Sequence, residues 1–130
     1  MPNVEPSLTG KRCLVLDDEF LIALDIQQIL ESAGAASVKC VGNPAEALEL
    51  LRGDVKFDFA VLDVKLSGVM RDSGTVAAEL TRQEIPFVFL TGMRRQDERM
   101  AQFAKAPVVE KPYDSALLLD AIVRALGARA

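Results

Sequence analysis

One short apolar run in the middle of the chain ends in a single carboxylate. The run covers residues 59–62, Phe-Ala-Val-Leu, and Asp63 follows it directly. A near-continuous hydrophobic run of this length is typical of a strand that is covered on both faces, as in parallel sheets. Open parallel sheets bind ligands beyond the carboxyl ends of their strands, so the pattern places Asp63 at an edge suited to binding.

Three further apolar runs are also followed by polar residues. Asp17 and Asp18 come after residues 13–16, Thr91 comes after residues 87–90, and Lys111 comes shortly after residues 108–109. We expect their carboxylates, hydroxyl and ammonium group to converge with Asp63 at one edge of the sheet. Three carboxylates at adjacent strand ends repel one another unless a cation lies between them, and Mg²⁺ is a hard cation that takes such oxygen ligands.

The alternation of apolar patterns predicts a single α/β domain. We expect strands at about residues 12–17, 37–41, 58–63, 86–90 and 107–109. We expect helices at about residues 20–33, 44–52, 75–84, 94–104 and 115–126. Five strands that alternate with five helices indicate a parallel sheet with right-handed crossovers and helices on both faces.

Turn residues and helix-capping residues predict the segments between these elements. Residues 1–10 are expected to form a tail, residues 11–130 the domain, and residues 65–74 a loop rich in turn residues. Asn43 suits the cap of the second helix, because Pro44 follows at the first helical position. Asp114 or Ser115 is expected to cap the last helix.

The composition excludes several classes of protein. The 130 residues contain no histidine, which excludes Ser-His and Cys-His catalytic pairs, histidine zinc clusters and phosphohistidine carriers. The formal net charge of −4 disfavours attraction to nucleic acid. No apolar run approaches the ~18 residues of a membrane span, and a signal peptide is not evident, so we expect a cytoplasmic protein without membrane partners. Cys13 and Cys40 lack metal-ligand spacing and are interpreted as core thiols, with redox chemistry as the alternative.

The converging polar groups suit phosphoryl transfer. Asp63 can act as a carboxylate nucleophile, as aspartate does in aspartyl-phosphate chemistry. A metal ion and the Lys111 ammonium can neutralise the charge that develops on a transferring phosphoryl group. The Thr91 hydroxyl can bind a phosphoryl oxygen once the group has arrived.

Four short motifs carry a family resemblance. They are Leu-Val-Leu-Asp-Asp-Glu at 14–19, Val-Leu-Asp at 61–63, Leu-Thr-Gly at 90–92 and Glu-Lys-Pro at 110–112. In this order and spacing the chain resembles the receiver domain of bacterial two-component response regulators. The resemblance implies a flavodoxin-like doubly wound fold with strand order 2-1-3-4-5. It also implies phosphorylation of Asp63 by a sensor histidine kinase or a phosphotransfer protein.

The same resemblance implies a set of site residues. Mg²⁺, with Mn²⁺ as a possible substitute, would be held by Asp18, Asp63 and the main-chain carbonyl of Lys65, with Asp17 acting through water. Thr91 and Lys111 would contact the phosphoryl group. The bond between Lys111 and Pro112 is expected to be cis, as in the family.

Two departures from the family pattern point to a subgroup. The position three residues before the lysine, where an aromatic switch residue is usual, is Val108. The loop after Asp63 is about two residues longer than usual before its Asp-Ser-Gly at 72–74. Together with residues 86–92, these features resemble a subgroup with a Phe-Ala-Thr-Gly type motif, which includes single-domain regulators and commonly works with HWE-class or related kinases.

Three functions are weighed. The leading hypothesis is a single-domain response regulator, not an enzyme, that acts through a downstream protein partner or as a phosphate sink; a homodimer stays open. The second is a Mg²⁺-dependent phosphohydrolase with an aspartyl nucleophile, but such enzymes need a general acid two residues later, where this chain has Lys65. The third is a degenerate receiver that serves only as a binding scaffold.

Overall fold

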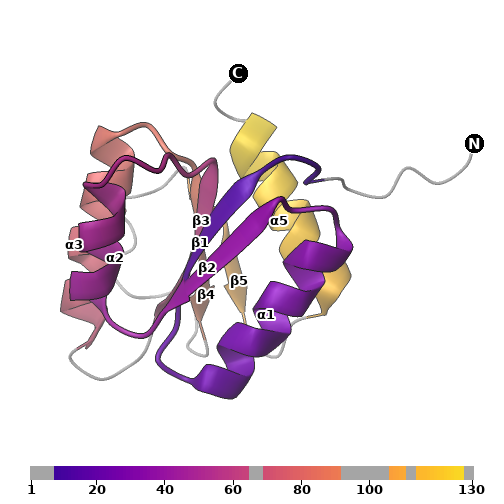
Figure 1. Cartoon of the computed structure of the whole chain (residues 1–130). Coiled ribbons are helices and arrows are strands. Elements are labelled where there is room, and N and C mark those ends of the chain that lie inside the picture. Colours follow the sequence, from indigo (N-terminus) through magenta and orange to yellow (C-terminus); the bar gives the residue numbers. More distant parts are fainter. Residues whose placement is uncertain (1–7, 65–68, 92–105, 111–113, 128–130) are drawn as a thin grey trace, which may run out of the picture.

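The computed structural model describes residues 8–64, 69–91, 106–110 and 114–127. Within these ranges the chain alternates between strands and helices (Figure 1). The elements are β1 (Arg12–Leu16), α1 (Phe20–Ser32), β2 (Ser37–Val41), α2 (Pro44–Leu51), β3 (Phe59–Val64), α3 (Val69–Arg82), β4 (Phe87–Thr91), β5 (Val108–Glu110) and α5 (Ser115–Gly127). The helix expected at 94–104 and the expected cis bond before Pro112 lie outside the described residues.

The strands form one parallel sheet in the order β2-β1-β3-β4-β5. This order confirms the fold expected from the sequence. Helices α2 and α3 cover one face of the sheet and helices α1 and α5 cover the other (Figure 1). Because every strand runs the same way, all carboxyl ends lie at one edge, which is the lower edge in Figure 1.

Strand β3 is buried on both of its faces. Ala60 and Leu62 belong to the core beneath α2 and α3, whereas Phe59 and Val61 belong to the core beneath α1 and α5. All four side chains are at most 1% exposed. The strand therefore separates two hydrophobic cores, which explains why its sequence is continuously apolar rather than alternating.

The predicted helix starts are largely confirmed. The Asn43 side chain accepts a hydrogen bond of 2.9 Å from the backbone N–H of Glu46, and Pro44 occupies the first turn of α2. Of the two candidate caps for α5, Asp114 is the one that accepts a bond from the N–H of Leu117, at 2.8 Å. Both side chains satisfy N–H groups that have no partner within their own helix.

Strands β4 and β5 each begin one residue later than expected, directly after Pro86 and Pro107. Proline has no N–H to donate to the sheet, so it stands before these strands instead of inside them.

Helix α3 begins earlier than the sequence prediction. The loop expected at residues 65–74 is wrong for residues 69–74, because α3 already starts at Val69. Val69 stands seven residues before Val76, so it extends the helical spacing of the buried Val76 and Leu80. A glycine inside a helix costs only about 1 kcal/mol relative to alanine, which the burial of Val76, Ala77 and Leu80 in the same helix can offset.

Residues 8–10, expected to belong to a tail, pack against the domain. Leu8 is fully buried, and its N–H donates to the carbonyl of Ala33 at 2.9 Å. Thr9 forms an antiparallel bridge with Ala35. The side chain of Leu8 fills the core beneath α1 and α5, a long-range contact that a short polar sequence context does not reveal.

Substitution of Gly34 should destabilise the fold. Gly34 has a φ of +102°, and a Cβ atom there would lie 2.9 Å from Thr9 Oγ1 and 3.3 Å from its backbone. We expect Gly34→Ala to lower the free energy of unfolding by about 1–3 kcal/mol, from backbone strain and this clash. Urea denaturation would measure the change. The control is Gly42→Ala, whose Cβ would meet nothing within 4 Å; equal stability of the two variants would contradict the prediction.

Candidate metal centre

The register of the sheet brings two aspartates to the same level. Leu16 of β1 is paired with Leu62 of β3, so the residues that follow them lie side by side: Asp17 directly after β1 and Asp63 near the end of β3. Asp18 joins them from the turn after β1. One carboxylate oxygen from each of the three lies within 4.8 Å of the others. The structure thus assembles the three predicted carboxylates into one cluster.

Asp17 is the most enclosed member of the cluster. Its side chain is 4% exposed, as is that of Asp63, whereas Asp18 is exposed to solvent. Its backbone N–H donates to the carbonyl of Val41 at 3.1 Å, which ties the end of β1 to β2. Its Oδ1 accepts a 2.9 Å bond from the N–H of Glu19, the residue that precedes α1. Asp17 therefore shapes the turn that presents Asp18.

The three carboxylates suit a hard divalent cation. Mg²⁺ binds oxygen at about 2.1 Å with octahedral geometry, so its ligand oxygens lie roughly 3 Å apart when adjacent and about 4.2 Å apart when opposite. Oxygens that lie within 4.8 Å of one another need only small adjustments to meet these distances. Two nearly buried carboxylates and a third beside them are stabilised by such a charge. The residues present therefore fit magnesium.

The remaining predicted site residues are placed by the backbone alone. Thr91, the last residue of β4, is paired with Val64, which directly follows Asp63. Glu110, the last residue of β5, is paired with Thr91. Val108 lies at the other end of β5, paired with Phe89. The sheet therefore brings the end of β4 next to the cluster, and it ends β5 one residue before Lys111.

Three predicted site residues lie outside the described residues. They are Lys65, Lys111 and Pro112.

The two cysteines fit the interpretation as core thiols. Burial raises the pKa of the Cys13 thiol well above its usual value, and the neighbouring Cys40 raises it further. The pKa of Cys40 is also raised, first by burial and then by the negative charges of Asp17 and Glu31. A thiol with a raised pKa stays protonated near neutral pH and is a poor nucleophile.

The chain is similar to a family of known proteins. The family model of the response regulator receiver domain matches residues 13–123. The chain belongs to the response regulator receiver family. Receiver domains are signalling modules and generally not enzymes; they bind Mg²⁺ at an acidic cluster and interact with histidine kinases and downstream partners.

Individual relatives of this receiver agree with the assignment. The transcriptional regulatory protein PdtaR of Mycobacterium tuberculosis is 32% identical over 115 residues, which cover 86% of this chain. The chain spans about half, 55%, of the length of this curated relative. A response regulator receiver protein from Sinorhizobium medicae is 29% identical, with a TM-score of 0.81 over 95% of this chain and 100% of that one.

A more distant neighbour shows likeness of fold alone. The receiver domain of the histidine kinase CKI1 from Arabidopsis thaliana, solved in complex with Mg²⁺ and BeF₃⁻, is 19% identical. Its TM-score is 0.72 over 93% of this chain and 92% of that one.

Among the described parts of the chain, no helix is long and apolar enough to cross a membrane.

One feature beside the cluster was missed by sequence reasoning. Phe20 and Leu21, at the start of α1, are each 76% exposed, and Leu24 is 38% exposed. The signal was present, because Phe20 to Leu24 is an unbroken apolar run that is too wide for one buried helix face. Only Ala23 of this run is buried and Ile22 packs partly against the core, so Phe20 and Leu21 leave exposed apolar surface at the start of α1, shortly after Asp18.

Magnesium affinity should depend on the carboxylates of Asp18 and Asp63. We expect Asp18→Asn and Asp63→Asn each to weaken Mg²⁺ binding roughly tenfold or more, because each removes a charged ligand. Isothermal titration calorimetry with Mg²⁺, repeated with Mn²⁺, would measure the dissociation constants. Asp54→Asn, which removes an exposed charge at the opposite edge of the sheet, should leave them unchanged. Equal affinities in all variants would place the metal elsewhere.

Proposed function

We propose that Asp63 accepts a phosphoryl group in a Mg²⁺-dependent reaction and that the phosphorylated domain signals through a protein partner. The observation that carries this proposal is the cluster of Asp17, Asp18 and Asp63 at the carboxyl edge of a parallel sheet. The cluster supplies both a nucleophile and ligands for the metal that the nucleophile needs. A phosphate-sink role has the same chemistry and differs only in lacking a downstream partner.

Transfer begins with the Asp63 carboxylate. One of its oxygens forms the new bond to phosphorus while the bond between phosphorus and the donor nitrogen breaks, and the donor imidazole keeps that electron pair. Asp18, Asp63 and the Lys65 carbonyl would hold Mg²⁺, with Asp17 acting through water. When bound, the metal neutralises charge on the phosphoryl oxygens. The Lys111 ammonium adds a second positive charge, and the Thr91 hydroxyl donates to a phosphoryl oxygen.

The proposed phosphodonor is a histidine outside this sequence. The 130 residues contain no histidine, and a sensor histidine kinase or a phosphotransfer protein would supply the phosphorylated imidazole. We assign the domain to the subgroup with the Phe-Ala-Thr-Gly type motif and its kinase to the HWE or a related class. Val108, where an aromatic is usual, supports this assignment and requires a readout other than the inward movement of an aromatic ring.

Phosphorylation should be observable without the kinase. Incubation with Mg²⁺ and acetyl phosphate is expected to add one phosphoryl group to the wild type, because the nucleophile and its metal site lie within this domain. Intact-mass analysis would detect it. Asp63→Asn and removal of Mg²⁺ with a chelator should each abolish the adduct, whereas Asp54→Asn should retain it. An adduct that persists in Asp63→Asn would refute the assigned acceptor.

The exposed apolar residues of α1 are suited to contact the phosphodonor. A donor histidine must reach bonding distance of Asp63, which is only 4% exposed, so the donor has to cover the surrounding edge. Phe20 and Leu21 lie at that edge, two and three residues after Asp18. Leu117, 56% exposed, lies in the first turn of α5, which begins at the same edge (Figure 1). Exposed apolar side chains beside a polar site are typical of a protein contact.

Substitution of the exposed apolar residues of α1 should slow transfer from a histidine kinase but not phosphorylation by acetyl phosphate. We expect Phe20→Ser with Leu21→Ser to slow transfer from a histidine kinase that phosphorylates the wild type, roughly tenfold, because buried apolar contacts are lost. Phosphorylation by acetyl phosphate should be unchanged, because that donor needs no docking surface. The control is Val55→Ser, which removes an exposed apolar side chain far from the site. If both donors slowed equally, the substitutions would have disturbed the acceptor itself.

A further inference from the structure

The turn between β1 and α1 is fastened by hydrogen bonds on both sides of Asp18. Before it, the backbone N–H of Asp17 donates to the carbonyl of Val41, the last residue of β2, at 3.1 Å. After it, the backbone N–H of Glu19 donates to Oδ1 of the Asp17 side chain at 2.9 Å. Asp18, the exposed member of the acidic cluster, therefore stands between two residues that are held in place.

The elements on either side of this turn are anchored in the fold. Strand β1 ends at Leu16, which is only 3% exposed. Helix α1 begins directly after Glu19, whose carbonyl accepts a 2.9 Å bond from the N–H of Ala23. Ala23 and Ile26 are both buried, so the first turns of α1 are fixed against the sheet. The side chain of Asp17 spans the gap between these two anchored elements.

The bond from Glu19 to Asp17 gives this carboxylate a second task besides its charge. An aspartate that accepts a bond from the backbone two residues later determines how the chain turns at that point. The turn places an oxygen of the exposed Asp18 within 4.8 Å of those of Asp17 and Asp63. A turn without this bond would have to become ordered when a metal binds, and that loss of entropy would lower the affinity.

We propose that Asp17 is a positioning residue of the metal centre, which holds the turn so that the carboxylate of Asp18 meets that of Asp63. This inference rests on the Mg²⁺ site of the proposed function and adds a role that depends on the acceptor Oδ1. It differs from the contact through water given above, which depends on the negative charge of Asp17. An asparagine keeps such an acceptor without the charge, so the two roles can be measured separately.

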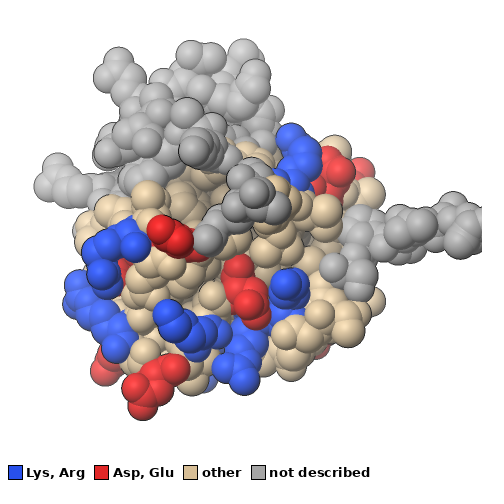
Figure 2. All heavy atoms as spheres, turned by 90° about the horizontal axis from the view of Figure 1, so that it is seen from above, with Lys and Arg blue, Asp and Glu red and all other residues tan. Residues whose placement is uncertain are grey.

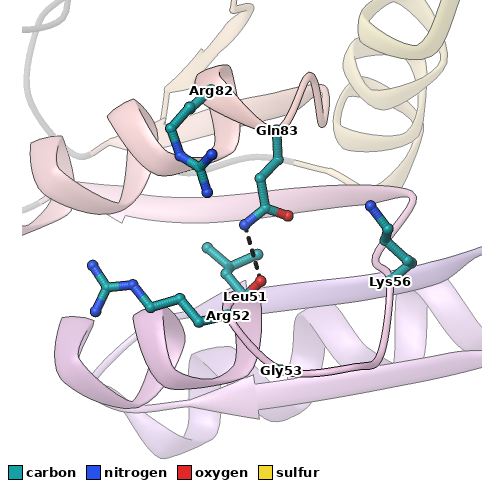
Figure 3. Close-up of a pocket in the computed structure, with 6 residues that line it drawn as sticks. All are labelled: Leu51, Arg52, Gly53, Lys56, Arg82 and Gln83. Carbon is teal, nitrogen blue, oxygen red and sulfur yellow. Dashed lines mark hydrogen bonds between the residues drawn. The ribbon is translucent and has the colours of Figure 1, made fainter.

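The opposite edge of the sheet offers a matched control. There Oδ2 of Asp58 accepts a 2.8 Å bond from the backbone N–H of Arg12, which joins the segment before β3 to the start of β1. Figure 2 looks onto this edge and shows Lys and Arg side chains interspersed with Asp and Glu side chains. At the same edge, Gln83 Nε2 donates to the carbonyl of Leu51 at 2.9 Å and joins the ends of α2 and α3 (Figure 3). Substitution of Asp58 therefore removes a bond of the same kind far from the cluster.

The test compares Asp17→Asn with Asp17→Ala, and Asp58→Asn with Asp58→Ala, by calorimetric titration with Mg²⁺. Both Asp17 variants lose the negative charge, and only the alanine also loses the acceptor. We expect Asp17→Ala to bind Mg²⁺ about tenfold more weakly than Asp17→Asn, the lower end of the cost of removing a residue that orients a metal ligand. The two Asp58 variants should differ from each other by less than about twofold, because the site is distant.

A second readout follows the hydrogen bond itself in Mg²⁺-free solution. Amide hydrogen exchange, measured by NMR, should show the Glu19 N–H protected in the wild type and in Asp17→Asn and exchanging faster in Asp17→Ala. Thermal unfolding of all four variants separates positioning from general loss of stability. Asp58→Ala should unfold at a lower temperature than Asp58→Asn and yet keep its Mg²⁺ affinity.

Two outcomes would overturn this proposal alone. Equal Mg²⁺ affinity of the two Asp17 variants would mean that only the charge matters. A difference in affinity without a change in Glu19 exchange would assign the effect to another contact. Asp17→Ser, whose hydroxyl accepts such bonds more weakly, should fall between the two variants, and it replaces Asp17→Ala in the comparison if that variant does not fold.

Failure of the proposed function gives a different result. A wild type that binds Mg²⁺ but takes no phosphoryl group from acetyl phosphate or a kinase would refute phosphoryl acceptance and leave the positioning role intact. A wild type that does not bind Mg²⁺ would overturn both.

Discussion

The pairing of β1 with β3 is the constraint on which the rest of the structure depends. It sets Asp17 and Asp63 side by side, although like charges at this distance repel one another. The fold tolerates this repulsion because the apolar side chains of β3 are buried in two hydrophobic cores, one on each face of the sheet. A slip of one residue would exchange Phe59 and Val61 with Ala60 and Leu62 between the two cores. Burial of apolar strand residues therefore holds an electrostatically unfavourable cluster in register.

Much of the fold was predictable because it depends on local patterns. The run at 59–62, the cap at Asn43 and the alternation of strands with helices are each set by neighbouring residues, and the parallel order followed from the family resemblance. The three carboxylates were predictable for the same reason, since each directly follows or adjoins the end of a buried strand. Parallel topology then places strand ends together without further information.

The features that were missed depend on contacts between distant segments. Leu8 is buried where its N–H bonds to the carbonyl of Ala33, just after α1, and nothing in residues 1–10 indicates that partner. Helix α3 includes Gly74 because the burial of Val76, Ala77 and Leu80 outweighs a modest local penalty. The ends of α2 and α3 meet through the bond from Gln83 to Leu51, which joins residues 32 positions apart. No local pattern encodes such a meeting.

The polarity of the parallel sheet explains why its two edges differ chemically. The helices run opposite to the strands, so their amino ends lie at the edge of the acidic cluster and their carboxyl ends at the other edge (Figure 1). Helix dipoles therefore favour negative charge around Asp63 and positive charge around Arg52 and Arg82. The topology therefore stabilises the carboxylates at one edge and these two cations at the other. Because the two edges are separated by the length of the strands, a partner at one edge leaves the other accessible.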